Sequence, residues 1–183
     1  MSVSSEVAAL FATRGASASY GEHVSTLQHC LQAAHFAQAD GAPPALVLAA
    51  LLHDVGHMIE AVPDDIAEWH VDARHEELGG AWLAQRFARE ISDPVRLHVP
   101  AKRYLCATDP SYFDKLSEAS VLTLKLQGGP MNATEVAAFE REQFWRDAIR
   151  VRQWDDRGKV AGLLTPGLEH YRPLIEALAR RQP

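Results

Sequence analysis

The residues most able to do chemistry lie in the segment His53-Asp54-Val-Gly-His57, which follows an apolar run from Ala45 to Leu52. On a helix, His53 and His57 lie four residues apart on one face, and Asp54 points to the same side as His53. The apolar run indicates a buried helix, where an ionised carboxylate is costly unless a positive group compensates it. A metal cation does so, and neutral imidazoles add ligands without adding charge. At this point a hydrogen-bonded His–Asp pair that only holds the helix in place is the alternative.

Other histidines and an aspartate belong to different predicted helices. The candidate ligands beyond His53 and Asp54 are His29, His75, His98 and Asp155. Together the set has four imidazoles and two carboxylates, more than one tetrahedral site uses. We therefore predict two metal ions, with Asp54 as the bridging ligand. Nitrogen and oxygen ligands without thiolate suit Fe, Mn, Co, Zn or, less well, Mg, and they do not distinguish redox iron from hydrolytic metals.

The elements that must position these residues are helices. Apolar residues recur with helical spacing through most of the chain, and no alternating segment of strand length is present. Ser25 is a suitable N-cap for the helix that carries His29. We predict an all-α protein, a single helical bundle domain over residues 1–183, with the Gly128-Gly129-Pro130 and Thr165-Pro-Gly167 segments separating helices. The later helices are predicted over residues 45–58, 75–90, 94–106, 112–126, 133–151 and 168–181.

Composition excludes several classes of protein. Among 183 residues, 18 Lys and Arg against 24 Asp and Glu give a net charge of −6, without the basic footprint of a nucleic-acid binder. The two cysteines, Cys30 and Cys106, do not form a disulfide framework. We find no basic leader segment and no apolar run long enough to span a membrane. We therefore expect a cytoplasmic protein with no nucleic-acid or membrane partner and leave its oligomeric state open.

The pattern of His29, His53-Asp54 and Asp155 resembles the HD-domain superfamily, a helical fold made up mostly of metal-dependent phosphohydrolases. Further segments narrow the resemblance to the mixed-valent diiron oxygenases of organophosphonate catabolism, from about Tyr20 to Tyr171. These segments are His75, His98-Val-Pro-Ala-Lys102-Arg-Tyr-Leu105, Leu116-Ser-Glu-Ala-Ser120, Gln127-Gly-Gly-Pro-Met131 and Arg152-Gln-Trp-Asp155.

The resemblance implies a site of two iron ions in the mixed-valent Fe(II)/Fe(III) state, with O2 as co-substrate. The first iron would be held by His29, His53, Asp54 and Asp155, and the second by Asp54, His75 and His98. His57 and Lys102 would be catalytic residues that contact the substrate, and Ser120 and Gln127 would line the same pocket. Tyr20 and Glu22 would close over the second iron until substrate displaces them, although they are one residue closer together than in the family pattern, which leaves the role of Tyr20 open.

The activity implied is oxidative cleavage of a carbon–phosphorus bond in a small organophosphonate. The substrate is 1-hydroxy-2-(trimethylammonio)ethylphosphonate, giving phosphate and glycine betaine, or the corresponding 2-amino compound, giving glycine. Tyr20, Trp69, Tyr104 and Tyr112 are aromatic residues that would suit a methylated cation. The alternatives are an HD phosphohydrolase that uses Mn or Co on a nucleotide or small phosphoester, and a non-catalytic, metal-stabilised binding protein.

Overall fold

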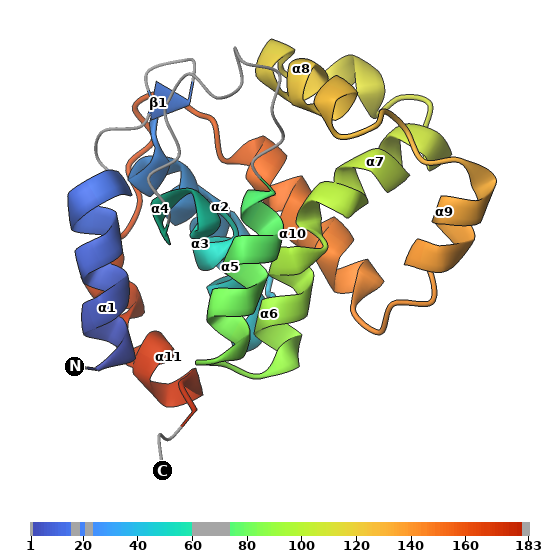
Figure 1. Cartoon of the computed structure of the whole chain (residues 1–183). Helices are drawn as coiled ribbons and strands as arrows, with labels where there is room; N and C mark the ends of the chain where they lie inside the picture. The colour runs from blue at the N-terminus through green and yellow to red at the C-terminus, as the bar shows by residue number, and fades with distance from the viewer. Residues whose placement is uncertain (1, 16–18, 21–23, 60–73, 181–183) are drawn as a thin grey trace.

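The computed structural model describes residues 2–15, 19–20, 24–59 and 74–180, and these residues are predominantly helical (Figure 1). The predicted all-α class is confirmed, since the strands of the described segments are two residues long and form one antiparallel pair, Ser19 with Ser25 and Tyr20 with Val24. The elements are α1 (Val3–Leu10), the π-helical turn η1 (Phe11–Gly15), β1 (Ser19–Tyr20), β2 (Val24–Ser25), α2 (Thr26–Ala39), α3 (Pro44–Leu52), α4 (Gly56–Ile59), α5 (His75–Ala84), α6 (Arg89–Arg96), α7 (His98–Thr108), the 3₁₀ turn η2 (Phe113–Lys115), α8 (Glu118–Leu126), α9 (Ala133–Phe139), α10 (Trp145–Arg157) and α11 (Leu168–Leu178).

Helix α3 is the centre of the fold. Every residue from Leu46 to Leu52 is buried, so the helix is apolar on all sides and has neighbours all round. Pro44 stands in its first turn, where a missing N–H costs no helical hydrogen bond. Helices α2, α6, α10 and α11 pack against α3, and they carry most of the main core. A smaller apolar cluster lies between α7, α9 and α10.

The chain turns directly after α3, so the prediction of one helix over residues 45–58 is wrong. The Nδ1 atom of His53 lies 2.8 Å from the carbonyl oxygen of Ala50, which competes with the backbone N–H that would extend the helix. Val55 and His57 instead bond to carbonyls three residues back, and α4 begins at Gly56. The two functional histidines of this segment therefore belong to different elements.

Other predicted boundaries are confirmed in part. Ser25 caps α2, accepting from the N–H of Gln28 in a reciprocal capping box. Gly128 and Gly129 have φ values of 96° and 72°, which favour glycine and end α8. The predicted helix over residues 133–151 is two helices, α9 and α10, and the helix over 75–90 ends at Ala84.

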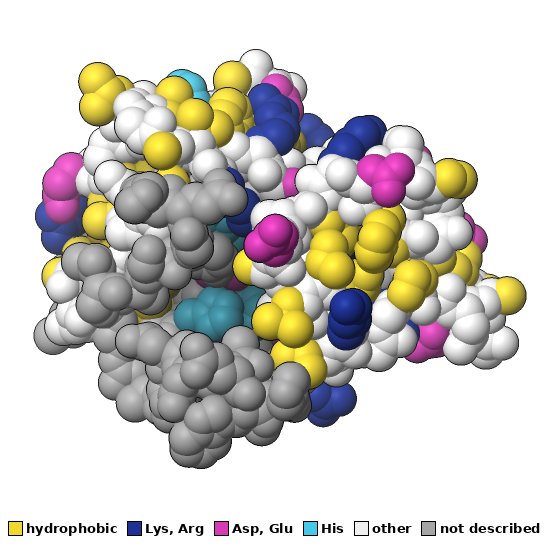
Figure 2. Space-filling model, turned by 90° about the horizontal axis from the view of Figure 1, so that it is seen from above, with side chains coloured by type: hydrophobic (Ala, Val, Ile, Leu, Met, Phe, Trp, Pro, Cys, Tyr) yellow, Lys and Arg dark blue, Asp and Glu magenta, His cyan; other side chains and the backbone are white. Residues whose placement is uncertain are grey.

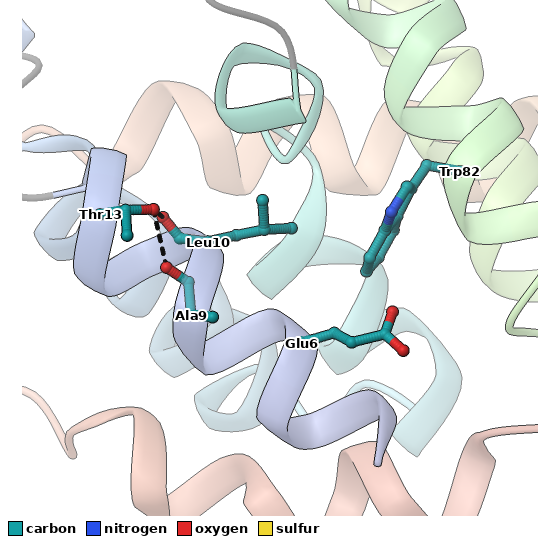
Figure 3. A pocket seen from close by; sticks show the side chains of 5 residues that line it. All are labelled: Glu6, Ala9, Leu10, Thr13 and Trp82. Atoms are coloured by element: carbon teal, nitrogen blue, oxygen red, sulfur yellow. Dashed lines mark hydrogen bonds between the residues drawn. The ribbon is translucent and has the colours of Figure 1, made fainter. Parts of the chain in front are cut away.

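Helices α8 and α9 lie on the side of the molecule away from α1 and α11 (Figure 1). A surface hollow of about 320 Å³ lies between α1 and α5, where Leu10 and Trp82 face each other (Figure 3). Its charged lining residue, Glu6, is already paired with Arg86 at 2.9 Å.

No helix within the described ranges is long and apolar enough to cross a membrane. The assignment of residues 1–183 to a single domain stays a prediction.

Candidate metal centre

Two histidines and one oxygen of Asp54 form the first half of the site. His29, from the first turn of α2, and His53, directly after α3, bring their Nε2 atoms to 3.0 Å from each other. Both Nε2 atoms face Oδ2 of Asp54, at 3.5 Å for His29 and 3.3 Å for His53. All three side chains are buried.

The other oxygen of Asp54 faces a second pair of histidines. His75 begins α5 and His98 begins α7, and their Nε2 atoms lie 3.3 Å apart. Oδ1 of Asp54 lies 3.5 Å from Nε2 of His75 and 3.7 Å from Nε2 of His98. Asp54 thus stands between two sets of ligand atoms, one facing each of its oxygens.

Asp155 approaches the first half from α10. Its Oδ1 atom lies 3.3 Å from Nε2 of His29 and 4.0 Å from Nε2 of His53. Its other oxygen, Oδ2, lies 2.8 Å from Nη1 of Arg152. All six predicted ligand residues are therefore gathered in one place by α2, α5, α7, α10 and the turn after α3.

Backbone carbonyls fix how three of the imidazoles are protonated. The Nδ1 atoms of His29, His53 and His98 lie 2.9, 2.8 and 2.6 Å from the carbonyl oxygens of Gly158, Ala50 and Val95, respectively. Since a carbonyl only accepts, each Nδ1 must carry the proton and donate it. This leaves Nε2 as the coordinating atom, which is the usual arrangement of a metal-bound histidine.

The charges of the polypeptide favour a cation between these groups. Burial alone would raise the pKa of Asp54, but the surrounding imidazoles, His53 foremost, hold it well below its usual range. Burial opposes the imidazolium form of His53 too, yet Asp54 raises the pKa of that ring to about 9. Burial lowers the pKa of His98 to about 4, so this ring is neutral at physiological pH. A metal ion would replace the proton that His53 otherwise holds, and the donor set therefore fits a metal.

His57 covers one imidazole of the second half. Its ring stacks on that of His75, with centroids 3.9 Å apart and planes 17° from parallel. Figure 2 shows histidine side chains through an opening on one face of the molecule. His57 is thus adjacent to the candidate metal ligands, as a residue that contacts substrate must be.

A group of positive and hydroxyl side chains, here called the cationic cluster, adjoins Asp155. The ammonium of Lys102 is buried and, in the described part of the chain, donates one hydrogen bond, to Oγ1 of Thr123 at 2.9 Å. Burial lowers the pKa of Lys102 from 10.5 to about 8, with repulsion from Arg152 adding to the effect. The cluster consists of Lys102, Ser120, Thr123, Arg152 and Lys159.

Ser120 links the members of this cluster. Its Oγ atom lies 3.5 Å from Nη2 of Arg152 and 3.5 Å from Nζ of Lys159. Lys159 lies in turn 3.5 Å from Oδ1 of Asp155. Lys102 and Ser120 were predicted from the sequence, whereas Thr123, Arg152 and Lys159 were not given roles. The spacing of Ser120, Thr123 and Gln127, which repeats on one helical face, is the signal that would have revealed Thr123.

The remaining residues predicted from the sequence have three different outcomes. Gln127 ends α8, and its Oε1 atom is buried with no hydrogen-bond partner among the described residues. Glu22 lies outside the described residues, as does Trp69, and for Tyr20 the structure describes only the backbone, in β1. Tyr104 packs against Phe139 and Trp145, away from the metal centre, and the hydroxyl of Tyr112 is bonded to Asp156.

The amino-acid sequence is similar to those of known proteins. The HD domain family matches residues 26–122. The chain is 44% identical over 172 residues to the glycine-betaine-forming 1-hydroxy-2-(trimethylamino)ethylphosphonate dioxygenase of Leisingera caerulea, covering 94% of this chain and 88% of that protein. It is 43% identical over 162 residues to the hydroxymethylphosphonate dioxygenase of Gimesia maris, covering 86% and 79% of the two chains. An uncharacterised protein of Acanthamoeba polyphaga mimivirus is 34% identical over 168 residues, covering 91% and 77%.

Proposed function

Because the chain belongs to the HD-domain family, and within it to the phosphonate dioxygenases, we propose that it cleaves the carbon–phosphorus bond of a 1-hydroxyalkylphosphonate with O2. The observation that carries the proposal is the position of Asp54, whose two oxygens face different pairs of imidazoles at 3.3–3.7 Å. This arrangement suits two metal ions that share one carboxylate. A site for a single ion has no use for the second pair of histidines.

We assign the two ions as iron in the mixed-valent Fe(II)/Fe(III) state. His29, His53 and Asp155 would hold one ion, His75 and His98 the other, and Asp54 both. Every donor atom in this set is nitrogen or oxygen, which is compatible with iron. The names of the relatives favour redox over hydrolytic chemistry. When bound, the iron pair supplies the means to react with O2, which the amino-acid side chains lack.

The protein's own groups would bind and orient the phosphonate. Lys102 is a buried ammonium whose hydrogen bond in the described chain goes to the neutral hydroxyl of Thr123. A buried charge is stabilised by a group of opposite charge, and a bound phosphonate would supply one. Ser120 and Gln127 would add neutral contacts from α8. His57, stacked on His75, is placed to hold or donate a proton at the substrate. The described residues of the cationic cluster would thus bind the phosphonate group of the substrate.

The substrate we favour is 1-hydroxy-2-(trimethylammonio)ethylphosphonate, and its conversion balances without a further reductant. One O2 takes up the four electrons lost by the hydroxyl-bearing carbon, the C–P bond breaks, and glycine betaine, hydrogen phosphate and one proton are formed. The 2-amino compound would give glycine by the same stoichiometry. Two free cysteines, one of them buried, agree with a reaction in the cytoplasm.

The test is to purify the protein, measure iron per chain, and record its electron paramagnetic resonance (EPR) spectrum. Oxygen uptake and phosphate release are then measured with the trimethylammonio, amino and hydroxymethyl phosphonates. We expect about two irons per chain, the signal of a coupled Fe(II)/Fe(III) pair, and equal uptake of O2 and release of phosphate. Tight binding of Mn or Co, with turnover of phosphate esters and no oxygen uptake, would overturn the proposal in favour of a hydrolase.

A further inference from the structure

Arg152 lies between the first half of the metal centre and the cationic cluster. It is buried on α10, one turn before Asp155, and its Nη1 atom lies 2.8 Å from Oδ2 of Asp155. On its other side, Nη2 lies 3.5 Å from Oγ of Ser120. A change in the position of this guanidinium would therefore act on a candidate metal ligand and on α8 together.

Asp156 holds the opposite edge of the guanidinium. Nη2 of Arg152 is bonded to Oδ1 of Asp156, and Nε donates to Oδ2 at 3.1 Å. This is the two-bond contact that arginine and carboxylate form most readily. Because Asp156 occupies that edge, only Nη1 reaches Asp155. With the edge free, Arg152 would be able to turn and take both oxygens of Asp155.

Tyr112 completes the arrangement from a different part of the chain. Its hydroxyl lies 2.5 Å from Oδ2 of Asp156 and accepts from Nε of Arg152 at 3.0 Å. Tyr112 lies between α7 and η2 in the chain and is buried. Burial raises the pKa of the phenol beyond its usual range, so it stays protonated and donates to Asp156. Each member of this Tyr112–Asp156–Arg152 group thus restricts the other two.

We propose that Tyr112 and Asp156 are positioning residues, which hold Arg152 so that it occupies Oδ2 of Asp155 and leaves Oδ1 as the single oxygen offered to a metal ion. The distances agree, since Oδ1 is the atom that faces His29, at 3.3 Å. The inference rests on the proposed function for the identity of the metal, but it concerns the ligand geometry of any metal held there. Outer partners of this kind commonly affect metal affinity about 10–100-fold.

The first test is Tyr112→Phe, which removes the hydroxyl and keeps the ring. Loss of iron from the loaded protein to a competing chelator is measured at equilibrium, together with the EPR spectrum and the melting temperature. We expect one of two irons to bind about 10-fold more weakly, the other to be unchanged, and the spectrum of the pair to shift. Tyr171→Phe is the control, because Tyr171 is also a buried tyrosine and its hydroxyl donates to Oε1 of Gln38, an exposed residue near the end of α2.

Two substitutions at Asp156 should weaken metal binding to different degrees. Asp156→Ala frees the edge of Arg152 and should weaken one iron about 100-fold, while Asp156→Asn keeps one acceptor and should fall between Asp156→Ala and the parent. If Tyr112→Phe and Asp156→Ala lower only the melting temperature, as Tyr171→Phe does, and leave chelator competition and spectrum unchanged, the proposal is wrong.

The outcome is separable from the proposed function. A parent protein that binds two metals but cleaves no phosphonate disproves the proposed function alone. Weaker binding of one metal in Asp156→Ala would support the positioning role even then, because that measurement needs no substrate.

Discussion

At the scale of single residues, Asp54 makes more contacts with the candidate metal ligands than any one imidazole does. Each histidine faces one of its oxygens, whereas Asp54 faces both pairs and supplies the negative charge between them. Its neighbours keep it ionised despite complete burial. In the proposed two-metal site, loss of its charge would therefore affect both metals, whereas loss of Asp155 would affect the metal held in the half that contains His29.

We predict that Asp54→Asn loses both metals and that Asp155→Asn loses one. The side chains keep their size, so the difference follows from the ligand charge. Since loss of an outer partner alone costs about 10–100-fold in affinity, the direct loss should exceed about 100-fold at each affected site. Metal per chain is measured after dialysis, with circular dichroism to confirm that both variants are folded. One tightly held metal in Asp54→Asn would show that Asp54 is not shared.

The proposed contact between Lys102 and the phosphonate predicts that the reaction depends on pH. Its pKa in the folded protein, about 8, lies below the ordinary 10.5, so the ammonium is present below pH 8 and is lost above it. We predict that kcat/KM for the phosphonate falls as the pH rises above about 8, because kcat/KM reports ionisations of the free enzyme. Lys102→Arg stays charged through this range and should remove the alkaline fall. The same fall in Lys102→Arg would assign it to another group.

At the scale of elements, the second pair of ligands depends on a close crossing between α4 and α5. A Cβ atom on Gly56 would lie 1.8 Å from the carbonyl oxygen of His75, and one on Gly79 would lie 3.2 Å from the backbone nitrogen of Gly56. Only glycine lets the two backbones approach in this way. This crossing places His75 beside Asp54 and under the ring of His57.

We predict that Gly56→Ala displaces the start of α5 and with it His75. The protein should lose about 1–3 kcal/mol of unfolding free energy, as overpacked sites do, and one of its two metals. Gly167→Ala is the control, since a Cβ atom there meets nothing within 4 Å and the cost at a helix N-cap stays near 1 kcal/mol or below. Denaturant unfolding and metal content are the measurements. Full metal content in Gly56→Ala would contradict the role given to the crossing.

How much of this arrangement the sequence predicts depends on whether its cause is local. The helical class, the cap at Ser25 and the break at Gly128-Gly129 follow from neighbouring residues and were predicted. The end of α3 was not, because apolar residues on both sides of His53-Asp54 suggest a continuous helix. The turn instead involves the contact of the His53 ring with the carbonyl oxygen of Ala50, together with the packing of Gly56 on His75, which is distant in the chain. The six ligand candidates were chosen by residue type. Arg152 was named within the segment Arg152-Gln-Trp-Asp155 but was given no role, because its contacts with Tyr112 and Ser120 join parts of the chain that are distant in sequence.

At the scale of the whole molecule, the metal centre joins helices that are far apart in the chain. His29 belongs to α2, Asp155 to α10, and His98 to α7, while the turn after α3 supplies the shared carboxylate. In the unfolded chain these groups are scattered and bind a metal poorly. A metal that binds only the folded chain therefore stabilises it by mass action.

We predict that removing the metals lowers the melting temperature. Free metal at 100 times its dissociation constant adds about 2.7 kcal/mol, which for a chain of 183 residues corresponds to roughly 5–10 °C. Melting is followed by calorimetry on loaded, chelator-treated and reloaded protein, and reloading should restore the parent value. Asp54→Asn is the internal control: it retains the other ligand side chains but should melt at the same temperature with and without added metal. A chelator effect of equal size in Asp54→Asn would mean that the stabilising metal binds elsewhere on the chain.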